Sequence, residues 1–383
     1  MDEILRRIVR FARRLLWRIM GPARPSRSPR RVLLVVSNEM TASYLGGVKA
    51  LFKGREDLVF FVTSAPGRVA EARTLAPTLE APFVPVWSAA MQWWDLILFS
   101  AHHAPHRFHP AVPKLFIHHS YDSGKKANGA DHRYGAPFVL DEQGESLYSA
   151  YLEMSEATRE RVEAELPALA GRIRVVGDLM ADRMFDATTR RDEVRAELGF
   201  SPEDRVVIMM STWGAESMME AMGETLIEAA EGLVGTYRFV LSTHPNHWTG
   251  PYSEKHPWGD RLLATRANGF DVITPDDDWT RFAIASDAAI SDHTSLAVTY
   301  ALLGRPLFFV PVDEAVMTLG TLGRQLYDAL PRIDGAHQLE NTLKTAWSDY
   351  PKANLETISR RIDSYPGEAA TRIRAEVERL VES

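Results

Sequence analysis

The chain has 383 residues, enough to bury a large core and to divide into about two domains. It contains no cysteine, which excludes disulfides, thiolate catalysis and cysteine metal sites. The net charge of −7 is unevenly spread, because residues 1–31 hold ten arginines against two acids while the rest carries 34 basic and 49 acidic residues. An acidic body of this kind does not fit a general nucleic-acid binder.

Residues 1–24 predict an amphipathic helix that associates with a membrane surface. At about 100° per residue, apolar side chains fill one half of the helical wheel. Arginines interrupt the apolar run too often for a transmembrane span or a secretory signal. We expect this helix to lie on an anionic leaflet; the alternative is packing on the protein body or on a partner chain. The opposite arc of the wheel comprises Arg6, Arg7, Arg10, Arg13, Arg14 and Arg18, with Trp17 among them.

After a polar linker at 25–31, strand and helix patterns alternate in a first domain expected over 32–185. The alternation predicts a doubly wound, Rossmann-like domain, and the last strand leads across a hinge. The expected strands are 32–37, 58–63, 83–87, 95–100, 115–118 and 173–177, and the expected helices are 45–52, 68–75 and a long amphipathic one at 146–166.

A second Rossmann-like domain is expected over 186–335, followed by helices at 336–383 that could pack back on the first domain. The predicted fold class is therefore α/β, with two doubly wound domains facing each other across a cleft. The second domain ends in a strand, a polar turn at 291–295, a helix and a further strand. Its expected elements are strands at 206–210, 238–241, 270–273, 287–290 and 307–310 and helices at 217–233 and 293–303.

Polar side chains follow several of these strands, at the edge where open α/β sheets bind ligands. In the turn 291–295, backbone N–H groups and the helix dipole favour an anion, although helix capping alone would also explain its polar residues. The histidines between 102 and 119 match no standard zinc spacing, so we predict no metal site. The candidate phosphate- or nucleotide-binding residues are Ser211, Thr212, His244, Asn246, Asp292, Thr294, Ser295 and Lys125.

Five segments between residues 110 and 312 carry a family resemblance. In chain order they read HHSYDSGKK, RVVGDLMADRMF, VRAELGFSPEDRVVIMMSTWG, STHPN and ISDHTSLAVTYALLGRPLFFVP. This order resembles the CDP-glycerol glycerophosphotransferases of teichoic-acid and capsule assembly. The resemblance implies two domains of the glycosyltransferase-B (GT-B) type, an active site between them, and a peripheral place on the cytoplasmic face of the cell membrane.

The resemblance also implies roles for individual residues. The catalytic residues would be His119, as the base that deprotonates the acceptor hydroxyl, and His244, which would contact the donor's phosphates. Thr294 and Ser295 would cradle the diphosphate. Two arginines of the family are replaced here, by Gly214 and Ser242. Lys125 and the neighbouring Lys126 could replace their charge.

The sequence thus predicts a membrane-associated transferase in cell-wall or capsule synthesis. It would move glycerol phosphate, or a related polyol phosphate, from a CDP-linked donor to a lipid-linked saccharide or polymer. One alternative is a GT-B glycosyltransferase or epimerase that uses a UDP-sugar, and another is a non-catalytic nucleotide-binding scaffold. The donor substrate would be CDP-glycerol, the sequence identifies no cofactor, and we expect no nucleic-acid partner. The sequence does not specify the acceptor, the number of units transferred, a need for divalent metal or the oligomeric state.

Overall fold

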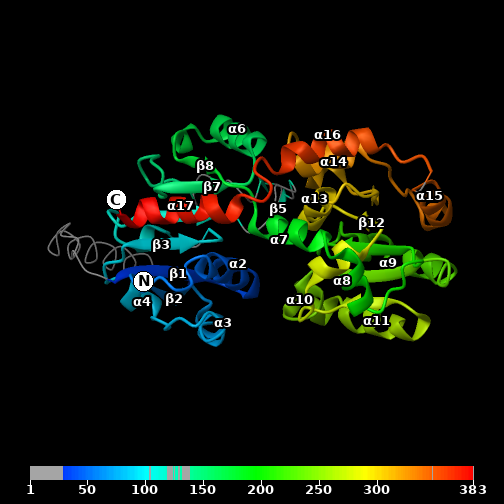
Figure 1. The fold of residues 1–383 in the computed structure, drawn as a ribbon, viewed down its shortest axis with the longest axis horizontal. Coiled ribbons are helices and arrows are strands. Elements are labelled where there is room, and N and C mark those ends of the chain that lie inside the picture. Colours follow the sequence, from blue (N-terminus) through cyan, green and yellow to red (C-terminus); the bar gives the residue numbers. More distant parts are fainter. Residues whose placement is uncertain are drawn as a thin grey trace.

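The computed structural model describes residues 29–102, 105–118, 124, 126–127, 130–131, 139–346 and 348–382. They form two domains that lie side by side, each built on a parallel β-sheet flanked by helices (Figure 1). This arrangement confirms the predicted α/β fold class with two Rossmann-like domains. The helix predicted at the amino terminus lies outside the described residues.

The first domain contains a six-stranded sheet of order β2-β1-β3-β4-β7-β8, with every neighbouring pair parallel. Alternate residues of its β1 strand pack on opposite faces: Val32 and Leu34 join one apolar cluster, and Leu33 joins another. Burial on both faces explains why this strand reads as a continuous apolar run. The strands are β1 (Arg30–Val36), β2 (Leu58–Ser64), β3 (Leu96–Phe99), β4 (Lys114–Ile117), β7 (Ala150–Glu153) and β8 (Ile173–Val175).

The helices of the first domain connect these strands, and a short antiparallel pair of strands follows β4. Caps formed by Asn38 and Ser155 begin two of the helices, since each side chain accepts a backbone N–H of the first turn. The elements are α2 (Glu39–Ala50), α3 (Val69–Leu75), α4 (Val86–Ala89), α6 (Glu156–Glu165), β5 (Lys126–Ala127), β6 (Ala130–Asp131) and the 3₁₀ helices η1 (Pro105–Arg107) and η2 (Pro167–Leu169).

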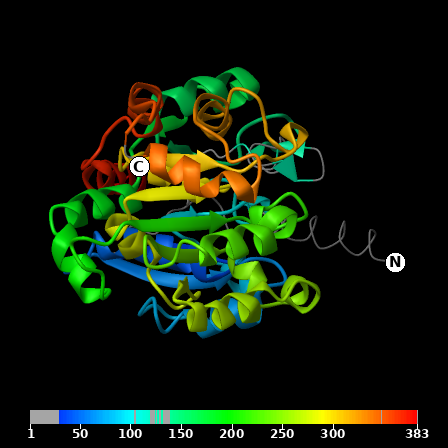
Figure 2. The same cartoon turned by 90° about the vertical axis from the view of Figure 1, so that its right-hand side faces the viewer.

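The second domain contains a five-stranded parallel sheet of order β11-β10-β9-β12-β13. Its central strand again alternates between two apolar clusters, with Ile208 in one and Val207 in the other. Figure 2 shows this domain with its strands layered between helices. The strands are β9 (Val206–Ser211), β10 (Arg238–Thr243), β11 (Asp271–Ile273), β12 (Ala288–Ser291) and β13 (Leu307–Phe309).

Helices cover this second sheet, and three further helices lie where the chain passes between the domains. The helices of the second domain are α8 (Arg191–Glu197), α9 (Met218–Glu231), α10 (Pro251–Lys255), α11 (Trp258–Thr265), α12 (Trp279–Ala285), α13 (Ser295–Ala301), α14 (Leu322–Ala329), α15 (Leu339–Ala346), η3 (Pro245–His247), η4 (Arg266–Asn268), η5 (Glu314–Val316) and η6 (Ala336–Gln338). The connecting helices are α7 (Leu179–Thr188), α16 (Lys352–Ile362) and α17 (Ala369–Glu382).

The chain crosses between the domains twice, and one aspartate joins the two crossings. It leaves the first sheet through α7 and returns through α16 to α17, which packs against α2 and α7 (Figure 1). The carboxylate of Asp182, on α7, accepts the backbone N–H of Gly367 at 2.6 Å and that of Ala369 at 2.9 Å. Asp182 therefore caps α17 and fixes the returning chain to the outgoing one.

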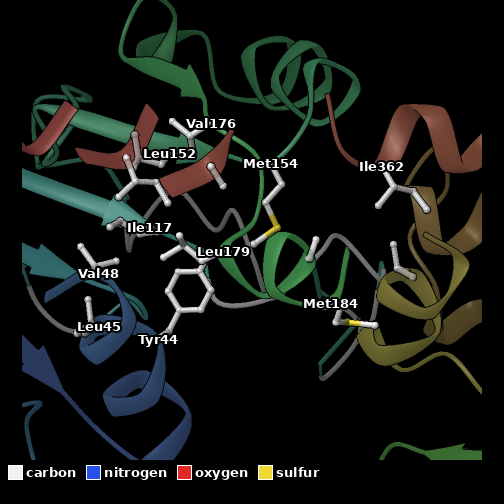
Figure 3. Packing of buried hydrophobic residues seen from close by; sticks show 14 of the residues in the cluster. Tyr44, Leu45, Val48, Ile117, Leu152, Met154, Val176, Leu179, Met184 and Ile362 are labelled. Carbon is white, nitrogen blue, oxygen red and sulfur yellow. The ribbon is translucent and has the colours of Figure 1, made fainter. Parts of the chain in front are cut away.

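A buried carboxyl lies at the same crossing. Asp178 caps α7 by accepting the N–H of Met180 at 3.0 Å, and it accepts the hydroxyl of Tyr44 at 3.1 Å. Figure 3 shows Tyr44 of α2 beside Leu179 of α7 within the apolar cluster that runs through both domains. Burial raises the pKa of Asp178 to about 6, and the nearby carboxylate of Asp363 adds to the shift.

Two sequence expectations in the first domain are wrong. Residues 146–166 do not form one helix, because 150–153 is strand β7 and the helix begins only at Glu156. The apolar strand β7 pairs with β4, and its Tyr151 lies opposite Phe116. Residues 83–87 are not a strand: only Phe83 bridges to β2, and a short helix starts at Val86.

Candidate functional site

The candidate site is built on the edge of the second sheet where the strands end. Strands β10, β9 and β12 are neighbours in that order, so the loops that follow them lie side by side. These loops begin at His244, Thr212 and Asp292. The backbone continues to pair beyond the strands, since the N–H of His244 donates to the carbonyl of Ser211 at 3.0 Å.

Asp292 joins two of these loops. Its side chain is fully buried and accepts the hydroxyl of Ser211 at 2.8 Å. The same carboxylate accepts the backbone N–H groups of Thr212 at 3.0 Å, Met218 at 2.8 Å and Thr294 at 3.1 Å. With four donor groups bound to it and no exposed surface, Asp292 organises the site. Its contact with a ligand stays a prediction.

Ser211 and Thr212 also have mainly structural contacts. The hydroxyl of Ser211 donates to Asp292 and accepts the N–H of Met219 at 3.2 Å, and the residue is only 2% exposed. Thr212 is 4% exposed. Both residues hold the turn between β9 and α9, and their contact with a nucleotide or phosphate stays a prediction.

The turn after β12 leads directly into α13. Thr294 is the N-cap of this helix, and its hydroxyl accepts the N–H of Leu296 at 3.4 Å. Ser295, the first residue of the helix, is half-buried. The unpaired N–H groups of such a turn can donate to a phosphate, whereas the Thr294 side chain is already used as a cap.

His244 and Asn246 lie on the loop after β10, which is next to the loop after β9. Both side chains are half-buried, and Nδ1 of His244 accepts the N–H of Asn246 at 3.1 Å. Because Nδ1 accepts this bond, the proton of the neutral ring lies on Nε2. Ser242, where the family has an arginine, is 4% exposed within β10, a position that favours a small side chain.

A cluster of polar side chains lies behind this edge, centred on Glu220 of α9. Nδ1 of His256 is 3.0 Å from its Oε1, and the hydroxyl of Tyr252 donates to the same oxygen at 3.3 Å. Nε2 of the buried His247 ring lies 3.6 Å from the same oxygen of Glu220, and burial lowers the pKa of His247. The Tyr252 hydroxyl also accepts the N–H of Gly214 at 3.0 Å, so the cluster fixes the loop after β9.

A second polar group lies at the corresponding edge of the first sheet. His118 and Glu153 follow or end the adjacent strands β4 and β7, and Nε2 of His118 is 2.9 Å from Oε1 of Glu153. Both side chains are almost fully buried, and the imidazole packs edge-on against Phe116 and Tyr151. His119 and Lys125 lie outside the described residues. No pattern in the sequence pointed to Glu153, which is 35 residues from His118.

The segment that follows β4 reaches the second domain at one described point. The carbonyl of Gly124 accepts the N–H of Thr318, which follows β13, at 2.7 Å. Gly124 has φ +74°, and a Cβ there would lie 2.2 Å from Oγ1 of Thr321. Glycine at this position therefore permits the strand-end loops of the two sheets to touch.

The membrane-binding residues predicted within 1–24 also lie outside the described part of the chain. No helix among the described residues is long and apolar enough to cross a membrane. Within the same residues, no three histidine, aspartate or glutamate side chains are grouped as a metal ion would require.

The chain was compared with known proteins and structures. No protein-family model matches it, and no curated protein matches it. Among solved structures, it is similar to the wall teichoic acid polymerase TagF, at a TM-score of 0.66 and 14% identity, over 100% of this chain and 95% of that one. The fold is that of the GT-B proteins.

Two sugar-nucleotide epimerase structures have a weaker similarity. The complex of S. aureus MnaA with UDP has a TM-score of 0.59 at 13% identity and covers 92% of this chain and 97% of that one. The UDP-GlcNAc 2-epimerase of Neisseria meningitidis, bound to UDP-GlcNAc, has a TM-score of 0.52 at 15% identity, over 92% and 100%. The GT-B architecture is thus common to both comparisons, and the match to TagF has the higher TM-score.

Proposed function

We propose that the protein is a transferase that moves glycerol phosphate, or a related polyol phosphate, from a CDP-linked donor to a lipid-linked saccharide or polymer. The observation that carries the proposal is the match to TagF over both domains, together with His244 and Ser295 on the strand-end loops that lie on either side of the loop after β9. Three of the five family segments found in the sequence, those that contain Thr212, His244 and Ser295, form this edge.

The chemistry needs little covalent participation by the protein. A hydroxyl oxygen of the acceptor attacks the phosphorus that carries the glycerol, the bond from that phosphorus to the CMP oxygen breaks, and CMP leaves. The acceptor's proton passes to a base, for which the resemblance implies His119. The second domain supplies hydrogen-bond donors for the phosphate oxygens from His244 and from the backbone at Ser295.

Other charges are required because the family's two arginines are absent. Gly214 has φ +104°, a conformation that strains any side-chain-bearing residue, and Ser242 is buried in a strand. We propose Lys125 as the replacement cation. Unchanged transfer by a Lys125→Ala variant would remove this part of the proposal.

The proposal is tested by incubating the protein with CDP-glycerol and vesicles that contain a lipid-linked saccharide. Release of CMP and incorporation of glycerol phosphate into the lipid fraction are measured together. We expect His244→Ala to lower both on the order of 100-fold, since it removes a donor to the transition-state charge. His337→Ala, a change at an exposed histidine of the same domain, is the matched control. Absence of CMP release with every acceptor would contradict the proposal.

We further propose that residues 1–24 bind the protein to an anionic membrane surface. Deleting these residues should abolish sedimentation with vesicles that contain anionic lipid and should leave CDP-glycerol binding unchanged. If the shortened protein sediments as the full chain does, the amphipathic-helix proposal is wrong.

A second candidate function is a UDP-sugar glycosyltransferase or epimerase, favoured by the similarity to the UDP-bound epimerase structures. A non-catalytic nucleotide-binding scaffold is the third, and the replacement of both arginines favours it. Turnover of UDP-N-acetylglucosamine would support the second function. Binding of nucleotides without turnover of either donor would support the third.

A further inference from the structure

Trp213 presents an indole ring at the strand-end edge of the second sheet. It comes two residues after β9, the central strand, and is 38% exposed, whereas the preceding Thr212 is buried. Trp94 and Trp258, by contrast, are buried. Its ring centre lies 5.9 Å from that of His244 on the neighbouring loop. The exposed part of this indole offers an apolar, flat surface next to the residue assigned to the phosphates.

The indole is held in place from behind. The ring of Tyr252 packs edge-on against Trp213, with centres 5.6 Å apart. Tyr252 is itself stacked on His256 at 4.3 Å, and its hydroxyl is bonded to the N–H of Gly214 and to Glu220. These contacts fix the ring of Tyr252, which supports Trp213, and the backbone of Gly214, which follows Trp213. Trp213 is therefore pre-organised before any ligand binds, which lowers the entropic cost of binding.

The chemistry of each side-chain ring determines which part of a ligand it can bind. The face of an indole carries negative electrostatic potential, so it does not attract phosphate oxygens but does stack with planar, uncharged rings. Imidazole N–H groups have the opposite preference. The edge is thus divided between Trp213, which suits a ring, and His244, which suits a phosphate. A pyrimidine nucleotide contains both parts within one molecule.

We propose that Trp213 is the platform on which the pyrimidine ring of a nucleotide stacks, with Tyr252 and His256 as the residues that position it. The inference rests on the proposed function in one respect, namely that the donor is a nucleotide. It adds a binding residue beyond those implied by the resemblance, and it applies to a cytidine or a uridine ligand alike.

The test measures the dissociation constants of CMP, UMP, ribose 5-phosphate and pyrophosphate by calorimetry for the full chain and its Trp213→Ala and Trp213→Phe variants. We expect Trp213→Ala to weaken CMP and UMP about 10- to 100-fold, as loss of one base–aromatic stack does. Binding of ribose 5-phosphate and pyrophosphate should not change, and Trp213→Phe should retain most of the affinity. Trp87→Ala is the matched control, since Trp87 is 74% exposed in the first domain.

The outcomes separate this inference from the proposed function. An unchanged CMP affinity in Trp213→Ala, or an equal loss for all four ligands, overturns the platform. A loss for ribose 5-phosphate as large as that for CMP assigns the surface to a sugar ring and also overturns it. A selective loss for CMP and UMP supports the platform even if no transfer from CDP-glycerol is found. Failure of the unaltered protein to bind any nucleotide contradicts both proposals.

Discussion

Replacing Asp292 by asparagine should destabilise the second domain although it changes only one atom. The carboxylate accepts one hydroxyl and three backbone N–H groups from two loops. An amide keeps one acceptor oxygen and turns the other into an NH₂ donor that faces further donors. If the amide oxygen stays near Ser211 and Met218, the amide NH₂ faces the N–H of Thr294. In the other orientation, the NH₂ faces the hydroxyl of Ser211 and the N–H of Met218.

The magnitude follows from the groups that lose a partner. In the better orientation at least one buried N–H and the new NH₂ are unsatisfied, at about 1–3 kcal/mol each. We therefore expect Asp292→Asn to lower the free energy of unfolding by about 2–6 kcal/mol. For a domain of this size that corresponds to a decrease in Tm of about 5–25 °C. Asp292→Ala leaves all four donors unpaired and should cost more.

The assay is urea unfolding followed by tryptophan fluorescence, with calorimetry for Tm. Asp276→Asn is the matched control, because Asp276 is an exposed aspartate on the loop after β11, another strand of the same sheet. An Asp292→Asn variant within about 0.5 kcal/mol of the unaltered protein would refute the structural role of Asp292.

Two further predictions concern the contacts between the domains. Gly124→Ala places a Cβ 2.2 Å from Oγ1 of Thr321 and should separate the two strand-end loops. We expect a larger radius of gyration by X-ray scattering and a loss of transfer on the order of 100-fold, the cost of misplacing a reacting group by about 1 Å. Gly144→Ala, at φ +81° with open space around it, should do neither. Asp178→Asn tests the buried carboxyl whose pKa is raised to about 6: the unaltered protein should lose stability as pH rises through 6, and the variant should not. From pH 4 to pH 8, the unfolding free energy of the variant minus that of the unaltered protein should rise by up to about 3 kcal/mol. A difference that does not depend on pH would contradict the raised pKa of Asp178.

Strands buried on both faces could be predicted from the sequence. Residues 32–37 and 206–210 are continuous apolar runs, and both form interior strands of parallel sheets. Segment 146–166 could not be resolved in this way, because its apolar residues fit a helical spacing as well as a strand. Pairing of Tyr151 with Phe116, a contact between distant parts of the chain, decides in favour of the strand.

The candidate site was predictable as a set of loops but not as a set of contacts. The sequence placed polar residues at the ends of strands, and the structure brings the loops at His244 and Asp292 to the two sides of β9, the strand between theirs. It gave no sign that Asp292 would be enclosed by donors from the loop at Thr212, 80 residues away. It also missed the pairing of His118 with Glu153 and the support of Trp213 by Tyr252. Each of these contacts depends on strand order, which local patterns do not encode.

The most direct test of the central claim is which nucleotides stabilise the folded protein. Thermal unfolding would be measured with CMP, CDP and CDP-glycerol, and separately with UDP and UDP-sugars. A ligand at about 100 times its Kd adds about 2.7 kcal/mol to the native state, which gives a measurable rise in Tm. We expect the cytidine ligands to raise Tm, with a smaller rise in His244→Ala. A rise with uridine ligands only would contradict the assignment of a CDP-linked donor.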